Sequence, residues 1–169
     1  SKAITHASTG FPTVDRRLDR ANLIIGDVVH PFLMQVVKDA WHGETTEKDL
    51  DDVIRIIESY IFRRLICQVA ANALNKIFAT AYNELRKLRT EGQTYADLLT
   101  WILRRRDGGS GRFPNDADFR DSFETRDCYH LRPNYRQYLF DVLENGDSKD
   151  NRDIADKLAS WDLTVEHIM

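Results

Sequence analysis

Apolar residues recur at intervals of three and four along most of this chain. Because an α-helix completes a turn in about 3.6 residues, such spacing gathers them on one side of a helix. Four stretches show it, namely residues 29–40, 74–88, 95–102 and 135–143. Each predicted helix carries one apolar stripe, which must pack against a neighbouring helix to leave water. The pattern therefore predicts an all-α protein built as a helical bundle.

Residues 47–67 depart from this one-sided pattern. Their apolar side chains, from Leu50 to Ile66, cover most of the circumference of a helix. A helix that is apolar nearly all round is packed on several sides. We therefore predict that this segment is the central helix of the bundle.

Start and stop signals flank the predicted helices. Thr46, Thr94 and Asn115 each stand three residues before an aspartate, a weaker form of the capping box in which a short polar side chain accepts a hydrogen bond at a helix start. Pro133 suits a first helical position, where its missing N–H would have no partner anyway. Glycines that can end helices follow at Gly92, Gly108, Gly109 and Gly146.

The last residues break the helical pattern. From Leu163 onward apolar and polar residues alternate, and β-branched residues are frequent. This predicts a strand over residues 163–169, with His167 on the same face as Leu163 and Val165. A single strand cannot pair its own backbone groups. We therefore expect the rest of its sheet to lie beyond Met169.

Composition is that of an ordinary globular protein, with 42% hydrophobic and 30% charged residues in 169 positions. No apolar run reaches the roughly eighteen residues that a membrane span requires. The start, from Ser1 to Gly10, is polar and unlike a secretory signal. Cys67 and Cys128 form no CxxC pair, which predicts two free, buried thiols in a reducing compartment. These features favour a cytoplasmic protein.

Charge is distributed unevenly along the chain. Residues 1–54 have 6 Lys/Arg against 9 Asp/Glu, residues 55–112 have 11 against 5, and residues 113–169 have 7 against 13. The net charge is thus −3, +6 and −6 in turn. A basic middle between acidic ends favours phosphate groups locally without making the whole chain a DNA-binding surface.

Two arginines lie in the predicted central helix. Arg64 falls seven residues after Ile57, on the buried stripe, and Arg63 precedes it. We predict that Arg64 is at least partly buried and paired with a carboxylate, because buried charges are normally paired. A phosphate contact is the alternative.

Three further arginines, Arg104, Arg105 and Arg106, end another predicted helix before a glycine-rich loop. Cations favour helix C-termini, so a structural explanation stands beside contact with a DNA backbone. No aromatic residue follows them until Phe113, which speaks against base stacking. We therefore expect only weak, non-specific duplex binding that falls with salt.

The remaining polar candidates are few. Asn72, Asn75 and Lys76 open the helix after the central one and are interpreted as capping and turn residues. The sequence has no phosphate-cradling glycine loop, HExxH sequence, nucleophile elbow or Cys/His metal cluster. A lone histidine such as His167 is usually structural. Taken alone, the residues leave open a non-catalytic nucleic-acid-binding module and a protein-interaction scaffold.

Five stretches together resemble one family. They are HPFL at 30–33, ESYIFRR at 58–64 together with Cys67, NALNKIF at 72–78, FPNDADF at 113–119 and TVEHIM at 164–169. In order and spacing they resemble the middle and early C-terminal part of GmrSD-type (type IV) restriction enzymes, over roughly residues 28–169. In that family a ParB-like NTPase domain precedes a helical region and a His-Me-finger (HNH-like) nuclease domain.

The resemblance implies a phage-defence restriction endonuclease that cleaves modified DNA in an NTP-dependent way. The family's nuclease motif reads His-Ile-x-Pro, and His167, Ile168 and Met169 match its first three positions. It implies that His167 is the general base, with Mg²⁺ or Mn²⁺ stabilising the charge on the attacked phosphate. The other metal ligands and the nucleotide site are expected outside this chain, so the chain alone is expected to be inactive.

The resemblance also implies two domains. Residues 1–107 correspond to a helical bundle from the family's middle region. Residues 113–169 correspond to a helical lead-in and the first strand of a truncated ββα-metal nuclease unit. The expected partner is DNA, reached through the full-length protein, and no membrane is expected.

Overall fold

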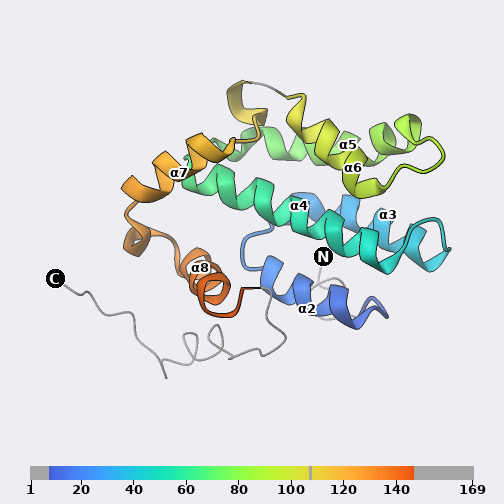
Figure 1. Ribbon diagram of the computed structural model, residues 1–169, viewed down its shortest axis with the longest axis horizontal. Coiled ribbons are helices and arrows are strands. Elements are labelled where there is room, and N and C mark those ends of the chain that lie inside the picture. Colours follow the sequence, from blue (N-terminus) through green and yellow to red (C-terminus); the bar gives the residue numbers. More distant parts are fainter. Residues whose placement is uncertain (1–7, 107, 147–169) are drawn as a thin grey trace. The chain divides into compact units, whose positions relative to one another are not determined.

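The computed structural model describes residues 8–106 and 108–146 (Figure 1). Every regular element within these residues is helical, which confirms the all-α prediction. The α-helices are α2 (Pro12–Ala21), α3 (His30–Trp41), α4 (Glu47–Ile66), α5 (Leu74–Leu88), α6 (Tyr95–Arg104), α7 (Asp116–Thr125) and α8 (Pro133–Asn145). Short 3-10 turns are η1 (Asp27–Val29), η2 (Ala71–Ala73), η3 (Gly109–Gly111) and η4 (Cys128–His130). The predicted strand over residues 163–169 lies outside the described residues.

The chain divides into two compact units, Ser1–Arg126 and Asp127–Met169. The boundary between these units falls after α7. The division between residues 107 and 113 that the resemblance implied stays a prediction. Helix α7 belongs to the first unit because it packs against α4, where the ring centroids of Phe119 and Phe62 lie 5.9 Å apart. The described part of the second unit consists of η4 and α8.

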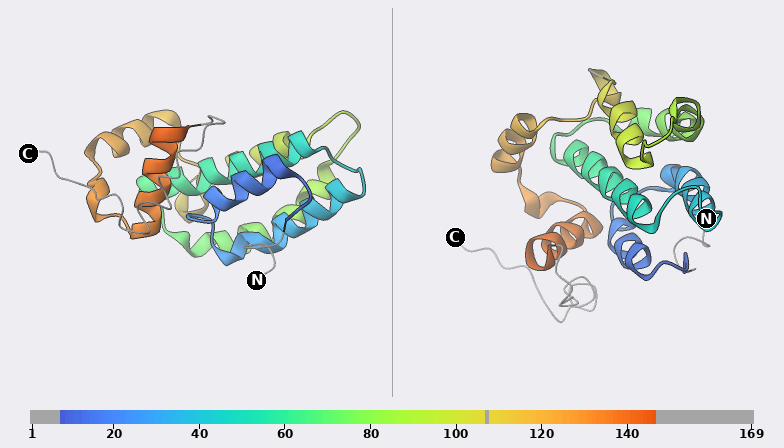
Figure 2. Two further views of the ribbon diagram at one scale, coloured as in Figure 1. Left: turned by 90° about the horizontal axis from the view of Figure 1, so that it is seen from below. Right: turned by 45° about the vertical axis from the view of Figure 1, so that its right-hand side comes forward.

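Helix α4 is the centre of the first unit, as its all-round apolar sequence predicted. It packs against α2, α3, α6 and α7, while α5 packs against α3 and α6. Figure 2 shows these helices around α4 from two further directions. The buried apolar side chains of α4 are Leu50, Val53, Ile54, Ile57, Tyr60, Ile61 and Ile66. None of the helices within the described ranges combines the length and apolarity needed to cross a membrane.

The three predicted helix caps are present. In each, a side-chain oxygen accepts a hydrogen bond from the backbone amide three residues later, over 2.8 to 3.1 Å. The pairs are Thr46 with Asp49, Thr94 with Asp97, and Asn115 with Asp118. Such caps satisfy amides that a helix start leaves unpaired, so local sequence sets where α4, α6 and α7 begin. Pro133 begins α8, also as predicted.

Helix α2 was not predicted from the apolar pattern. Its buried residues are Val14, Leu18 and Ala21. Ion pairs hold it to α4, because Arg17 and Arg20 each lie 3.3 Å from Glu58. Glu58 is only 3% exposed, and burial raises its pKa although both arginines oppose the shift. Tertiary contacts therefore stabilise a helix whose apolar stripe is short.

Helix α4 ends at a left-handed residue that is not glycine. Gln68 has a φ of 54°, and the next amide, that of Val69, donates to the Arg64 carbonyl oxygen over 2.8 Å to close the helix end. A side chain is strained in this conformation. Gln68→Gly should therefore raise the free energy of unfolding by up to roughly 1 kcal/mol in urea denaturation.

The matched control for this prediction is Gln35→Gly. Gln35 is exposed within α3, where glycine should destabilise the helix by about 1 kcal/mol. A loss of stability at both positions would contradict the strain assigned to Gln68.

Candidate nucleic-acid interface

Helix α6, which ends in the predicted contact arginines, is anchored at its first turn. The buried Asp49 carboxylate on α4 accepts hydrogen bonds from the amides of Tyr95 and Ala96, over 2.8 and 2.9 Å. Thr94 accepts from the amide of Asp97. The first three amides of α6 thus have side-chain acceptors, and the start of the helix is fixed to α4.

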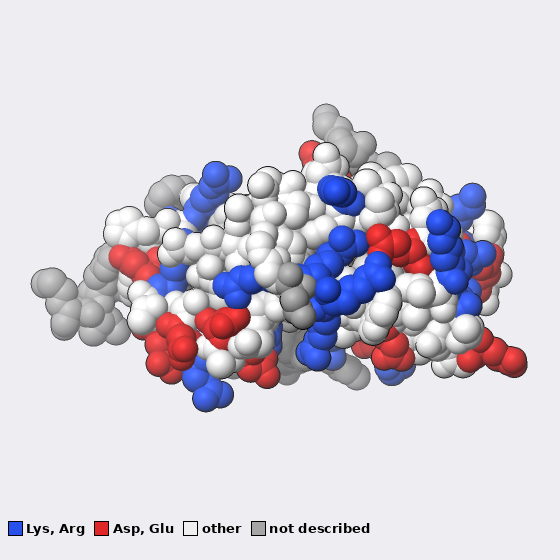
Figure 3. Space-filling model, turned by 90° about the horizontal axis from the view of Figure 1, so that it is seen from above, with Lys and Arg blue, Asp and Glu red and all other residues white. Residues whose placement is uncertain are grey.

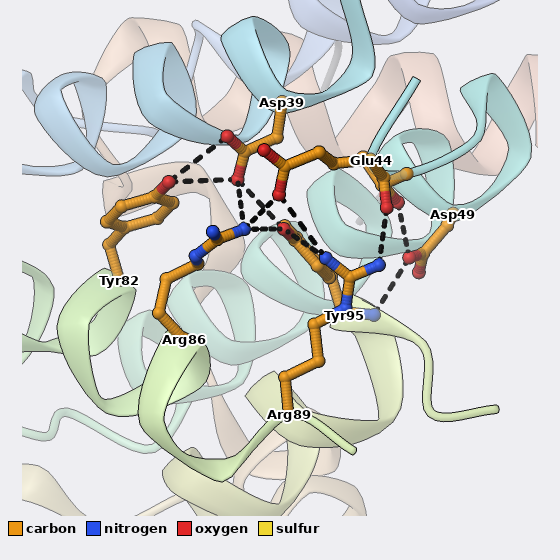
Figure 4. Close-up of polar contacts among 8 residues, drawn as sticks. Asp39, Glu44, Asp49, Tyr82, Arg86, Arg89 and Tyr95 are labelled. Carbon is orange, nitrogen blue, oxygen red and sulfur yellow. Dashed lines mark hydrogen bonds and ion pairs between the residues drawn. The ribbon is translucent and has the colours of Figure 1, made fainter. Parts of the chain in front are cut away.

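A polar network beside this anchor joins α3, α5 and α6 (Figure 4). The buried Asp39 carboxylate on α3 accepts hydrogen bonds from the hydroxyls of Tyr82 and Tyr95, each 2.9 Å from Oδ2. Arg86 on α5 donates to the Tyr95 hydroxyl over 3.1 Å. Burial, together with the Asp39 hydrogen bond, raises the pKa of Tyr82 to about 12. Tyr82 therefore remains a proton donor to Asp39 at neutral pH.

The network continues to the surface through Glu44 and Arg89. Glu44 pairs with Arg86 and lies 3.6 Å from Arg89. The hydrogen bond from Arg86 lowers the pKa of Glu44. Arg89 stacks on Tyr95, with 4.7 Å between its guanidinium carbon and the ring centroid. Because each carboxylate here already accepts hydrogen bonds or ion pairs from fixed donors, we assign the network an anchoring role.

The C-terminal end of α6 is held by a glutamate. Arg105 and Arg106 both pair with Glu84 on α5, Arg106 over 3.1 Å. Burial opposes ionisation of Glu84, but the hydrogen bond from Thr80 and the charges of the two arginines outweigh it and lower the Glu84 pKa. Two of the three predicted DNA contacts therefore have a structural partner.

Arg104 and Trp101 are the outward-facing members of this end of α6. Arg104 is exposed and forms no ion pair with any residue in the described ranges. Trp101 is 51% exposed, and the guanidinium carbon of Arg105 lies 4.5 Å from its ring centroid. Figure 3 shows Lys and Arg side chains gathered near the middle of the face that carries α5 and α6.

Trp101 was missed by the sequence prediction, which considered only aromatic residues downstream of the arginines. The sequence does indicate a contact between Trp101 and Arg105, since they are four residues apart, the spacing that makes side chains neighbours on a helix. Whether such a ring faces the core or solvent depends on the packing of α6, which the spacing alone does not show.

Arg64 is buried as predicted, at 2% exposure, but its predicted carboxylate partner is wrong. Its guanidinium donates to the carbonyl oxygens of Ala70, Ser110 and Arg112 over 2.7, 2.6 and 3.0 Å. It also donates to the Tyr60 hydroxyl over 3.2 Å. Burial lowers the pKa of Arg64. Backbone carbonyl groups thus stabilise the positive charge of Arg64, and its hydrogen bonds join the 109–112 turn to α4.

Arg63 fastens the next part of the same segment. It lies 2.6 Å from the Asp116 carboxylate and donates to the Pro114 carbonyl oxygen over 3.3 Å. Its guanidinium carbon is 5.2 Å from the ring centroid of Phe119. Both arginines of α4 are therefore engaged in holding the path from η3 into α7.

The other candidates are placed as follows. Asn72 and Asn75 are exposed. Asn72 lies in the η2 turn, in keeping with its interpretation as a turn residue. Neither asparagine caps α5, whose N-cap is Ala73 without a side-chain bond, so the capping part of that interpretation is wrong. Lys76 is exposed. Neither Cys67 nor Cys128 forms a disulfide within the described residues, as predicted, but both are only half-buried.

The predicted general base could not be placed in the structure. His167 lies outside the described residues, and so does the nuclease motif to which it was assigned. Across residues 8–106 and 108–146 no group of three or more His, Cys, Asp or Glu side chains could hold a metal ion.

A scan against protein-family models found no match, and searches of curated proteins and of solved structures found none either. The resemblance to type IV restriction enzymes stays a prediction from the five sequence stretches.

Proposed function

We propose that the helical unit Ser1–Arg126 is a connector that contacts a DNA backbone through the C-terminal end of α6. Its main support is the exposed Arg104, which has no ion pair to any described residue. No carboxylate among the described residues competes with a phosphate for this guanidinium, and arginine forms strong charge-assisted hydrogen bonds with phosphate oxygens.

Rigidity of the presenting helix also supports this role. Helix α6 is fixed to α4 by Asp49 at its start and to α5 by Glu84 at its end. An arginine carried on a helix held at both ends is positioned before its ligand arrives, so less conformational freedom is lost on binding.

We propose also that this connector serves an endonuclease that cleaves modified DNA, as the family resemblance implies. The support is the order and spacing of the five stretches. In that enzyme His167 would act as the general base, with Mg²⁺ or Mn²⁺ as the metal cofactor and a nucleotide as the regulator. The helices would pass nucleotide-dependent changes to the nuclease.

Arg104→Ala should weaken duplex binding by a few-fold at low salt. Loss of one phosphate contact should also make the logarithm of affinity depend less steeply on the logarithm of salt concentration, by about one unit of slope. The measurement is fluorescence anisotropy of a labelled duplex over a series of salt concentrations.

The matched control for this measurement is Arg16→Ala, which removes an exposed arginine from α2. Equal losses in the two variants would show that only net charge matters and would contradict a contact at α6. Absence of binding by the wild-type chain at low salt would contradict the proposed function itself.

The chain alone should not cleave DNA in the presence of Mg²⁺ or Mn²⁺. A general base acts only when the metal and the phosphate are held beside it, and one histidine does not make such a site. A plasmid-nicking assay checks this expectation. Cleavage that copurifies with the chain and is abolished by His167→Ala would show that the chain holds a complete site.

A protein-interaction module is the second candidate function. It is favoured by Met34 and Trp41, which are 53% and 61% exposed and stand seven residues apart on the same side of α3. Analytical ultracentrifugation of the wild type and a Met34→Asp variant tests self-association. Concentration-dependent association that the substitution removes would favour this candidate.

A further inference from the structure

Trp101 stands apart from the apolar stripe of its own helix. Trp101 is 51% exposed, whereas the buried residues of α6 are Tyr95, Ala96, Leu98, Leu99, Ile102 and Leu103. Its indole ring therefore contributes only part of its surface to the core. Single exposed apolar residues are common on proteins, so the ring becomes informative only through its neighbours.

The neighbours of Trp101 hold the ring and surround it with positive charge. Arg105 lies over the ring at 4.5 Å and is itself held by Glu84. Arg104 follows Trp101 by three residues and is exposed, so it projects from the same side of the helix. Arg104, Arg105 and Arg106 outnumber Glu84, the carboxylate that pairs with two of them, so the described residues here have a positive balance.

We propose that Trp101, Arg104 and Arg105 form a binding site for single-stranded nucleic acid. An unpaired base stacks on the exposed part of the Trp101 ring, and its phosphate contacts Arg104. Arg105 packs on the same ring and keeps it in place. This inference rests on the proposed function, because both require nucleic acid at the C-terminal end of α6.

Unpaired bases fit this surface better than a duplex does. In a duplex the faces of the bases are covered by their neighbours, so an aromatic side chain cannot stack on them without opening the helix. A single strand presents the base face and the phosphate together, and every base has such a face. The site should therefore be tolerant of sequence. This proposal differs from the sequence expectation, which gave base stacking little support because it considered only aromatic residues after the arginines.

The test compares a labelled oligo(dT) strand with a duplex of the same length, by anisotropy at low salt. The wild-type chain should bind the single strand more tightly than the duplex. Trp101→Leu should weaken single-strand binding by roughly tenfold, as expected for the loss of one stacked base, and leave duplex binding nearly unchanged. Trp41→Leu, which removes the exposed tryptophan of α3, should change neither single-strand binding nor duplex binding.

Tryptophan fluorescence gives a second measurement that does not depend on how well Trp101→Leu folds. The chain has three tryptophans, and stacking of a base on Trp101 should quench part of their emission. The quenching on addition of oligo(dT) should persist in the folded Trp41→Leu variant. Absence of quenching in that variant while the strand is bound would overturn the stacking site.

The remaining outcomes separate this inference from the proposed function. Duplex binding that depends on Arg104, together with single-strand binding insensitive to Trp101→Leu, would overturn the stacking site and leave the backbone contact standing. No binding of either nucleic acid would overturn both. Tighter binding of an acidic, glutamate-rich peptide that depends on Trp101 would identify a protein partner and overturn the inference.

Discussion

Arg64→Ala should lower the free energy of unfolding by roughly 3 kcal/mol or more, because four hydrogen bonds from one buried guanidinium are lost together. The carbonyl oxygens of Ala70, Ser110 and Arg112 would lose their shared donor. The Tyr60 hydroxyl would lose one as well, although it still donates to the Gly111 carbonyl oxygen over 2.9 Å. Urea denaturation followed by far-UV circular dichroism measures the loss.

The neighbouring Arg63→Ala is the matched control, since it deletes the same side chain one residue away. Its main ion pair is with Asp116, whose side chain is 87% exposed, and exposed pairs contribute about 1 kcal/mol or less. We therefore expect the loss at Arg63 to be clearly smaller. A loss at Arg64 equal to or below that at Arg63 would contradict the role assigned to the buried guanidinium.

Asp49→Ala should lower the free energy of unfolding by roughly 2–4 kcal/mol, because two buried amides lose a charged acceptor. These amides belong to Tyr95 and Ala96, and Asp49 is their link to α4. Hydrogen exchange at the two amides should also accelerate, since the first turn of α6 would open more readily. Urea denaturation and amide exchange by NMR provide the two measurements.

Asp52→Ala is the control for Asp49→Ala, as it removes a carboxylate from the same helix. Asp52 pairs over 2.7 Å with Lys48, whose side chain is 87% exposed, so the loss should be clearly smaller than at Asp49. Unchanged exchange at Tyr95 and Ala96 in the Asp49 variant would contradict the anchoring of α6 by this carboxylate.

The positions of most helices could be predicted because their signals are local. The predicted caps Thr46, Thr94 and Asn115 bond amides only three residues away, so neighbouring sequence contains all that is needed. The central place of α4 could also be predicted, since a helix with apolar residues all round must be covered on several sides. Helix α2 could not be predicted in this way, because its ion pairs with Glu58 join segments that are far apart in the chain.

For Arg64, the sequence predicted the burial of the side chain but not its hydrogen-bond partners. Its burial follows from its angular position relative to Ile57, which helix geometry alone sets. The hydrogen-bond partners of Arg64 do not follow from helix geometry, because three of them are the carbonyl oxygens of residues 70, 110 and 112. Backbone acceptors are the same in every sequence, so no residue type marked them. Only the return of the chain after α6 brought the 109–112 turn to this side chain.

Some features of the candidate interface were also predictable from sequence, and others were not. By itself, the sequence determined that basic residues gather at the end of α6 and that Trp101 stands one turn before Arg105, because both are matters of order and helical spacing. Only the tertiary structure decided that Glu84 on α5 engages Arg105 and Arg106, that Arg104 stays exposed and that the Trp101 ring faces outward. The physical reason is that exposure and ion pairing depend on which helix faces pack together. The residues that pack against a helix come from distant parts of the chain, and the local sequence pattern does not identify them.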